Sequence, residues 1–151
     1  MKHILTFACL LFFLTVNAQV GVNTTEPKST LDINGNLSLK VVSLNGGPSG
    51  TATPIDDGVY INLTPTSGNA EFILPDATQL PGRIYILRNV SDTETAQIYS
   101  NGGSLFSGDS RVATGAPVNM TADTAGDGND PTKTLIFISD GANWTYGALG
   151  L

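Results

Sequence analysis

The stretch VGVNTTEPKSTLDINGNLSL, residues 20–39, carries the clearest structural signals in this chain of 151 residues. Pro27 has no backbone N–H to give to a ladder, and the neighbouring serine and threonine hydroxyls compete for backbone groups, which favours a polar turn over residues 23–30. Apolar and polar residues then alternate with the period of two that is typical of strands, on both sides of a turn at Asn34-Gly35. We therefore expect a polar corner followed by two short strands, whose apolar positions are Leu31 and Ile33, then Leu37, Leu39 and Val41.

Two strings within this stretch carry a resemblance to known proteins, namely GVNTTEP at residues 21–27 and LDINGNL at residues 31–37. Together they resemble the G-[IV]-[GN]-T-T-x-P...L-D-[VI]-x-G motif of bacteriophage tail-fibre proteins and small secreted proteins of the Bacteroidota. In many of those fibres three chains wind into an elongated β-structured shaft. The resemblance thus implies a homotrimer, a fibre-type β motif over residues 19–42, and a structural or adhesive role without catalysis.

Residues 1–18, which precede the motif, have the pattern of a cleaved signal peptide. Lys2 gives a positive start, residues 4–16 are mainly apolar, and Val16 and Ala18 occupy the positions that signal peptidase reads. The apolar run is shorter than the roughly 20 residues that a membrane-spanning helix needs. We expect cleavage after Ala18, no stable membrane insertion, and a protein secreted to the cell surface or the medium, with the periplasm as the alternative.

Cleavage would leave a strongly acidic chain. Residues 1–18 contain the single cysteine, the single histidine and one of the seven basic residues, so six basic residues would remain against thirteen acidic ones, a net charge of −7. Phosphate recognition needs grouped Lys and Arg side chains, and this chain has no such group. We expect no nucleic-acid partner and no disulfide. We also expect neither Ser-His-Asp nor Cys-His catalysis nor an ordinary zinc site, because these need His or Cys.

Beyond the motif, the sequence predicts a linker and then an all-β body. Residues 43–57 are rich in Gly, Pro, Ser and Thr and are expected to form an exposed loop. Short alternating segments then recur at intervals of roughly eight to twelve residues, which is the rhythm of a β-sandwich or a jelly-roll-like fold. The body is expected to span residues 58–151.

Several segments of this body are assigned as strands. The strongest are residues 83–90 and 132–139, and the second of these is expected to form a terminal hairpin with residues 143–149. One short turn of helix is expected at residues 76–80, because Pro81-Gly82 stops anything longer. Further strands are expected at 59–64, 71–74, 96–99, 105–106, 111–114 and 118–121.

The terminal hairpin contains a candidate glycan-binding site. Trp144 and Tyr146 are expected on one face, next to Asn143, and aromatic rings beside a polar side chain suit a sugar ligand. A carbohydrate-binding, lectin-like module is therefore the alternative function. Aromatic residues at alternating strand positions also pack in cores and subunit interfaces, and that explanation stays open here.

An acidic loop at residues 122–131 contains a candidate metal site. Asp123, Asp127 and Asp130 place carboxylates on a segment with glycines, and clustered oxygen ligands suit calcium. The loop lacks the alternation and the terminal Glu of an EF-hand, and a solvated acidic loop is the alternative. We expect no other cofactor.

A carboxylate-based glycan hydrolase is the third function considered. It would need two acidic side chains that face each other across a sugar. The available acids lie mostly in predicted turns, where Asp bonds backbone amides. We therefore expect no enzyme activity from Asp56, Asp57, Glu71, Asp76, Asp109 or Asp140.

Overall fold

The computed structural model describes residues 20–23, 31–123 and 130–148, and the chain divides into two units. In the first unit, residues 1–38, β1 (Val20–Val22) pairs in parallel with β2 (Leu31–Ile33). Asn23 follows β1 with a φ of 58°, and its side-chain amide donates a hydrogen bond to the Asn34 carbonyl over 3.2 Å. The strand expected at Leu31–Ile33 is confirmed, whereas the second expected strand begins only at Val41.

The second unit, residues 39–151, is all-β and sandwich-like, as the sequence predicts. Its strands are β3 (Val41–Asn45), β4 (Gly47–Pro48), β5 (Thr53–Pro54), β6 (Tyr60–Thr64), β7 (Asn69–Leu74), β8 (Ile84–Asn89), β9 (Ala96–Ser100), β10 (Leu105–Ser107), β11 (Ala113–Thr114), β12 (Val118–Met120), β13 (Thr134–Ser139) and β14 (Trp144–Ala148). The expected helical turn is the 3-10 helix η2 (Ala77–Gln79). No helix in the described residues is long and apolar enough to cross a membrane.

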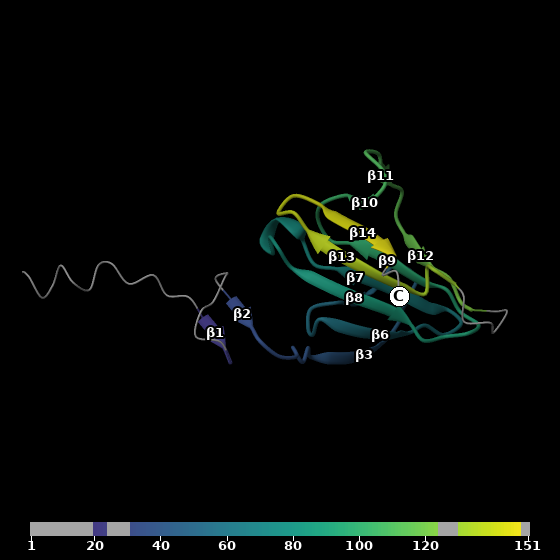
Figure 1. Cartoon of the computed structure of the whole chain (residues 1–151). Coiled ribbons are helices and arrows are strands. Elements are labelled where there is room, and N and C mark those ends of the chain that lie inside the picture. The colour runs from purple at the N-terminus through teal and green to yellow at the C-terminus, as the bar shows by residue number, and fades with distance from the viewer. Residues whose placement is uncertain (1–19, 24–30, 124–129, 149–151) are drawn as a thin grey trace, which may run out of the picture. The chain divides into compact units, whose positions relative to one another are not determined.

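Two sheets make up this body and lie against each other (Figure 1). The seven-stranded sheet has the order β11-β10-β14-β13-β8-β6-β3, and the five-stranded sheet has the order β12-β9-β7-β4, with β5 also paired to β7. The strands β13 and β14 form the terminal antiparallel hairpin that the sequence predicts. Both sheets are mixed. The strands β3, β6 and β8 run parallel in one and β7 and β9 run parallel in the other, whereas β13 is antiparallel to β8 and β12 is antiparallel to β9.

The chain alternates between the two sheets and so winds around the core in stacked, solenoid-like coils. Each coil is one pass of the chain through both sheets. Val41 pairs with Tyr60 in one sheet and Thr53 pairs with Phe72 in the other, each 19 positions further on. The next coil repeats this agreement with a spacing of 26 positions, from Tyr60 to Ile86 and from Phe72 to Ile98. Each coil therefore lies in register on the previous one in both layers at once.

The inward faces of both sheets form one hydrophobic core. Along β8, Tyr85 and Leu87 are fully buried while Ile84 and Ile86 point to the other face, as the alternation predicts. Burying a side chain of this size stabilises the fold by about 1.5–3 kcal/mol. The core comprises Ile55, Ile61, Leu63, Phe72, Leu74, Ala77, Tyr85, Leu87, Ala96, Ile98, Leu105, Val118, Met120, Leu135, Phe137 and Trp144.

The exposed loop expected at residues 43–57 is instead part of this body. It contributes most of β3 and all of β4 and β5, and Ile55 after them is fully buried. A Cβ on Gly46 would lie 2.2 Å from the Asn69 carbonyl oxygen, and one on Gly47 would lie 2.1 Å from the Thr51 carbonyl oxygen. These two glycines therefore permit close backbone packing, which composition alone does not distinguish from flexibility.

Candidate functional site

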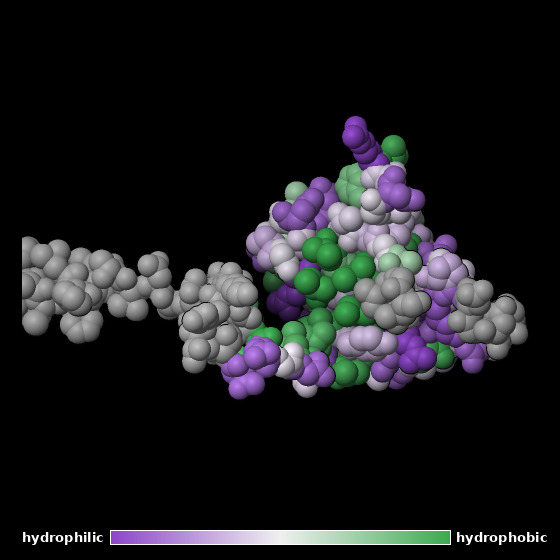
Figure 2. Space-filling view, in the orientation of Figure 1, coloured by the Kyte–Doolittle hydropathy of each residue, from purple (hydrophilic) through white to green (hydrophobic). Residues whose placement is uncertain are grey.

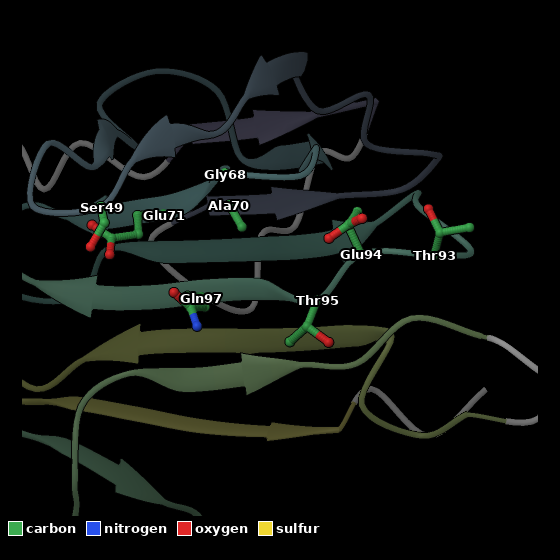
Figure 3. A pocket seen from close by; sticks show the side chains of 8 residues that line it. All are labelled: Ser49, Gly68, Ala70, Glu71, Thr93, Glu94, Thr95 and Gln97. Carbon is green, nitrogen blue, oxygen red and sulfur yellow. The ribbon is translucent and has the colours of Figure 1, made fainter.

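A shallow polar groove of about 390 Å³ lies on the body (Figure 3). Its residues come from three places in the sequence that the fold brings together: between β4 and β5, at the start of β7 and the residue before it, and from residue 93 into β9. In Figure 3 the side chains of Glu71 and Glu94 lie toward different ends of the lining. The lining comprises Ser49, Gly68, Ala70, Glu71, Thr93, Glu94, Thr95 and Gln97.

Glu71 is held firmly in this groove, with 8% of its surface exposed. One carboxylate oxygen accepts a hydrogen bond from the Gly50 N–H over 2.8 Å, and the other accepts one from the Tyr99 hydroxyl over 3.4 Å. Burial raises the pKa of Tyr99 above its ordinary value, and the negative charge of Glu71 raises it further. The carboxylate is thus oriented by two donors that leave part of its hydrogen-bonding capacity free.

Polar side chains continue from Glu71 across the five-stranded sheet. The register of β7 with β9 pairs Glu71 with Gln97, and that of β9 with β12 pairs Gln97 with Asn119. The alternating core residues Phe72 and Ile98 face inward, so this row lies on the outer face. The groove offers carboxylate and amide groups to a polar ligand, and none of its eight lining residues is basic.

The sequence gives no signal for this groove. In the sequence, Glu71 is only one of several acidic residues that could act in catalysis, and no motif surrounds Glu94 or Gln97. Glu71 and Gln97 lie side by side because β7 pairs in parallel with β9, and these two paired residues are 26 positions apart in the chain. Such a pairing leaves no local pattern in the chain.

The predicted glycan site does not form a surface platform. Trp144 is fully buried, its indole N–H donates to the Pro75 carbonyl over 3.0 Å, and its ring lies 5.7 Å from that of Tyr85. The ring of Tyr146 stacks on Phe137, and its hydroxyl lies 2.9 Å from the Thr114 hydroxyl. The indole belongs to the core, so it has no free face on which a sugar could stack.

Asn143, the third residue of that predicted site, holds a turn. Its side-chain oxygen accepts a hydrogen bond from the Ser104 N–H over 3.0 Å, and its own N–H donates to Asp140 over 2.7 Å. This fixes the β13–β14 turn beside the start of β10. In the structure Asn143 therefore contributes to the turn, and the adjacent Trp144 packs in the core.

The predicted calcium loop is described only in part. Asp127 lies outside the described residues, whereas Asp123 and Asp130 lie within them. One Asp130 oxygen accepts hydrogen bonds from the Thr132 N–H and hydroxyl over 2.8 and 2.7 Å, and the other pairs with the Thr121 hydroxyl. Within residues 31–123 and 130–148, no three His, Cys, Asp or Glu side chains are grouped so that they could hold a metal ion.

The bonds to Asp130 predict a dependence of stability on pH. The hydroxyls of Thr121 and Thr132 hold the pKa of Asp130 below its ordinary value of 3.8. Because the folded-state pKa is the lower one, this stabilisation is present above the unfolded-state value and disappears as pH falls through the folded-state value. We expect Asp130→Asn to be less stable than the wild type at neutral pH. Urea titrations should show the two converging as the pH falls below the ordinary value of 3.8 and through the lower folded-state pKa; a constant difference would contradict this.

Three other acidic residues, Asp57, Asp76 and Asp140, accept hydrogen bonds from backbone amides in turns, as the sequence predicts. Asp76 accepts from the Thr78 N–H over 2.9 Å at the start of η2, and Asp140 accepts from the Ala142 N–H over 2.8 Å. Asp57 pairs with Lys40 over 2.5 Å. These carboxylates are used in local structure rather than aimed together into one cleft.

Comparisons with known proteins return no match. No protein-family model and no curated protein matches the sequence, and no solved structure matches the fold.

Proposed function

We propose that this protein is a non-enzymatic structural or adhesive module, exported to the cell surface or beyond, which works as a homotrimer. The observation that carries the proposal is the exposure of apolar side chains in the N-terminal unit. Val22, Leu31 and Leu37 are 49%, 55% and 59% exposed. A module that acts through contacts between chains needs such side chains at its surface.

The N-terminal unit supports this proposal physically. Its sheet has two strands of three residues each, and a lone two-stranded sheet is at best marginally stable in water. Burial of each exposed Val or Leu against a sister chain would contribute up to about 1.5–3 kcal/mol. The number of three chains comes from the resemblance of residues 21–37 to fibre motifs.

Analytical ultracentrifugation of the exported protein tests the proposal. We expect a trimer at micromolar concentration and dissociation toward monomer in the double variant Leu31→Ser, Leu37→Ser, because the apolar contacts between chains are lost. Asn36→Ser, in the same segment, is the matched control and should leave the trimer intact. A wild-type protein that sediments as a monomer throughout would refute the proposal.

Carbohydrate binding is the second candidate function, and the polar groove around Glu71 favours it. Carboxylate and amide groups suit sugar hydroxyls, and the groove is open to solvent. On a glycan array, saturable binding that is lost in Gln97→Ala would support this function. Binding that persists in that variant would place any glycan site elsewhere.

A further inference from the structure

The outer face of the seven-stranded sheet carries a broad apolar surface. In one row across adjacent strands, Val41 pairs with Tyr60, Tyr60 with Ile86, and Ile86 with Ile136. A neighbouring row pairs Ile84 with Ile138, and Ile138 with Thr145, which in turn pairs with Phe106. We call these side chains the outer-face patch: Val41, Tyr60, Ile84, Ile86, Phe106, Ile136 and Ile138.

This patch is accessible in the single chain. Val41, Ile84 and Ile138 are 61%, 42% and 41% exposed, and the other members are partly buried. Figure 2 shows hydrophobic residues gathered over the seven-stranded sheet. Strands β3, β6 and β8 are parallel, and parallel strands usually have both faces covered. We therefore expect another protein surface to pack on this open apolar face.

Charge indicates what that cover is. Of the outward positions on the seven strands, Arg88 is the only charged one, whereas the whole chain has a net charge of −6. Two copies repel each other across most of their acidic surface, and like charges in an interface oppose association. The strands of this face carry a single charge, so a second copy can approach it without most of that penalty.

The size of the face suits the centre of a protein interface. Each row crosses four strands at about 4.8 Å spacing and occupies about 7 Å along the strands, so the two rows give on the order of 270 Å². A standard interface buries about 800 Å² on each partner, with an apolar centre and a polar rim. The adjoining polar row of Ser43, Asn62, Arg88 and Thr134 supplies such a rim.

We infer that the outer-face patch is the surface through which the body of one copy contacts the body of another. The inference rests on the self-association proposed above, but it concerns the body, residues 39–151, rather than the N-terminal unit. It predicts that the assembly has two separable sets of contacts, one between N-terminal units and one between bodies. Charge placed on the patch weakens the contacts between bodies and leaves those between N-terminal units intact.

Sedimentation of the full exported chain over a range of concentrations tests this with Ile138→Glu. The expected result is an association constant reduced at least tenfold. Asn119→Glu, at an exposed position on the outer face of the five-stranded sheet, is the matched control and should associate as the wild type does. Val41→Glu, at the most exposed patch position on the edge strand β3, repeats the test should Ile138→Glu fail to fold.

Wild-type association in a folded patch variant would overturn the inference. The proposed trimer would remain testable separately, from the sedimentation mass of the wild type and of the double variant Leu31→Ser, Leu37→Ser. Loss of stability without a change in association would mean that a segment of the same chain covers the patch. That result would also overturn the inference. A reduction in Ile138→Glu or Val41→Glu, with none in Asn119→Glu, would support it.

Discussion

Replacing Trp144 with alanine is expected to lower the free energy of unfolding by about 3–5 kcal/mol. The indole is fully buried, its ring lies 5.7 Å from the Tyr85 ring, and its N–H donates to the Pro75 carbonyl over 3.0 Å. Removal leaves a cavity between the two sheets and a carbonyl without its donor. Urea denaturation followed by far-ultraviolet circular dichroism measures the change.

Tyr85→Phe is the matched control for this prediction. Tyr85 is as deeply buried as Trp144, but its hydroxyl has no hydrogen-bond partner among the residues that the structure describes. Its removal should change the free energy of unfolding by less than about 1 kcal/mol, because no bond is lost and the ring remains. A Trp144→Ala protein with wild-type stability would contradict the core assignment of Trp144 and reopen a binding role for its ring.

The second large effect is expected at Asn89, which is fully buried at the end of β8. Its side-chain amide donates to the carbonyls of Glu94 and Met120 over 2.9 Å each, and its oxygen accepts from the Ser91 N–H over 2.9 Å. One side chain thus ties the turn after β8 to the end of β12. Asn89→Ala should cost about 3 kcal/mol or more, because several partly buried groups lose their partners together.

Ser91→Ala provides the comparison within the same turn. The Ser91 hydroxyl accepts from the Glu94 N–H over 2.9 Å, but its position is only partly buried, whereas Asn89 is fully buried. We expect a loss of about 0.5–1.5 kcal/mol for Ser91→Ala. Equal losses in the two variants, measured by the same urea titration, would show that the burial of Asn89 contributes nothing beyond local turn formation.

Local patterns in the sequence predict most strands of the body. The expected strands at 83–90 and 132–139 correspond to β8 and β13, because apolar residues at alternating positions can bury one face of an extended chain. Turn residues mark their ends equally well, as at Asp140-Gly141, where Gly141 has a φ of 90°. These features depend on neighbours within a few positions, so a single sequence contains them.

Prediction from the sequence fails where the role of a residue depends on residues that are distant in the chain. Gly46 and Gly47 have the composition of a linker, but the fold places other backbone against them. The groove around Glu71 likewise depends on strands whose paired residues are 26 positions apart. The aromatic ring of Trp144 shows a related ambiguity, because alternation places it on one face of β14 without stating whether that face is covered.

The sequence by itself determined that the body is built of short strands, where most of them begin and end, and which side chains share a face. The tertiary structure alone decided that the chain alternates between two stacked sheets, which face lies in the core, and that an apolar face remains outside. The reason is physical: strand formation and turn chemistry act between near neighbours, whereas pairing across 19 or 26 positions is selected by the burial of the whole core.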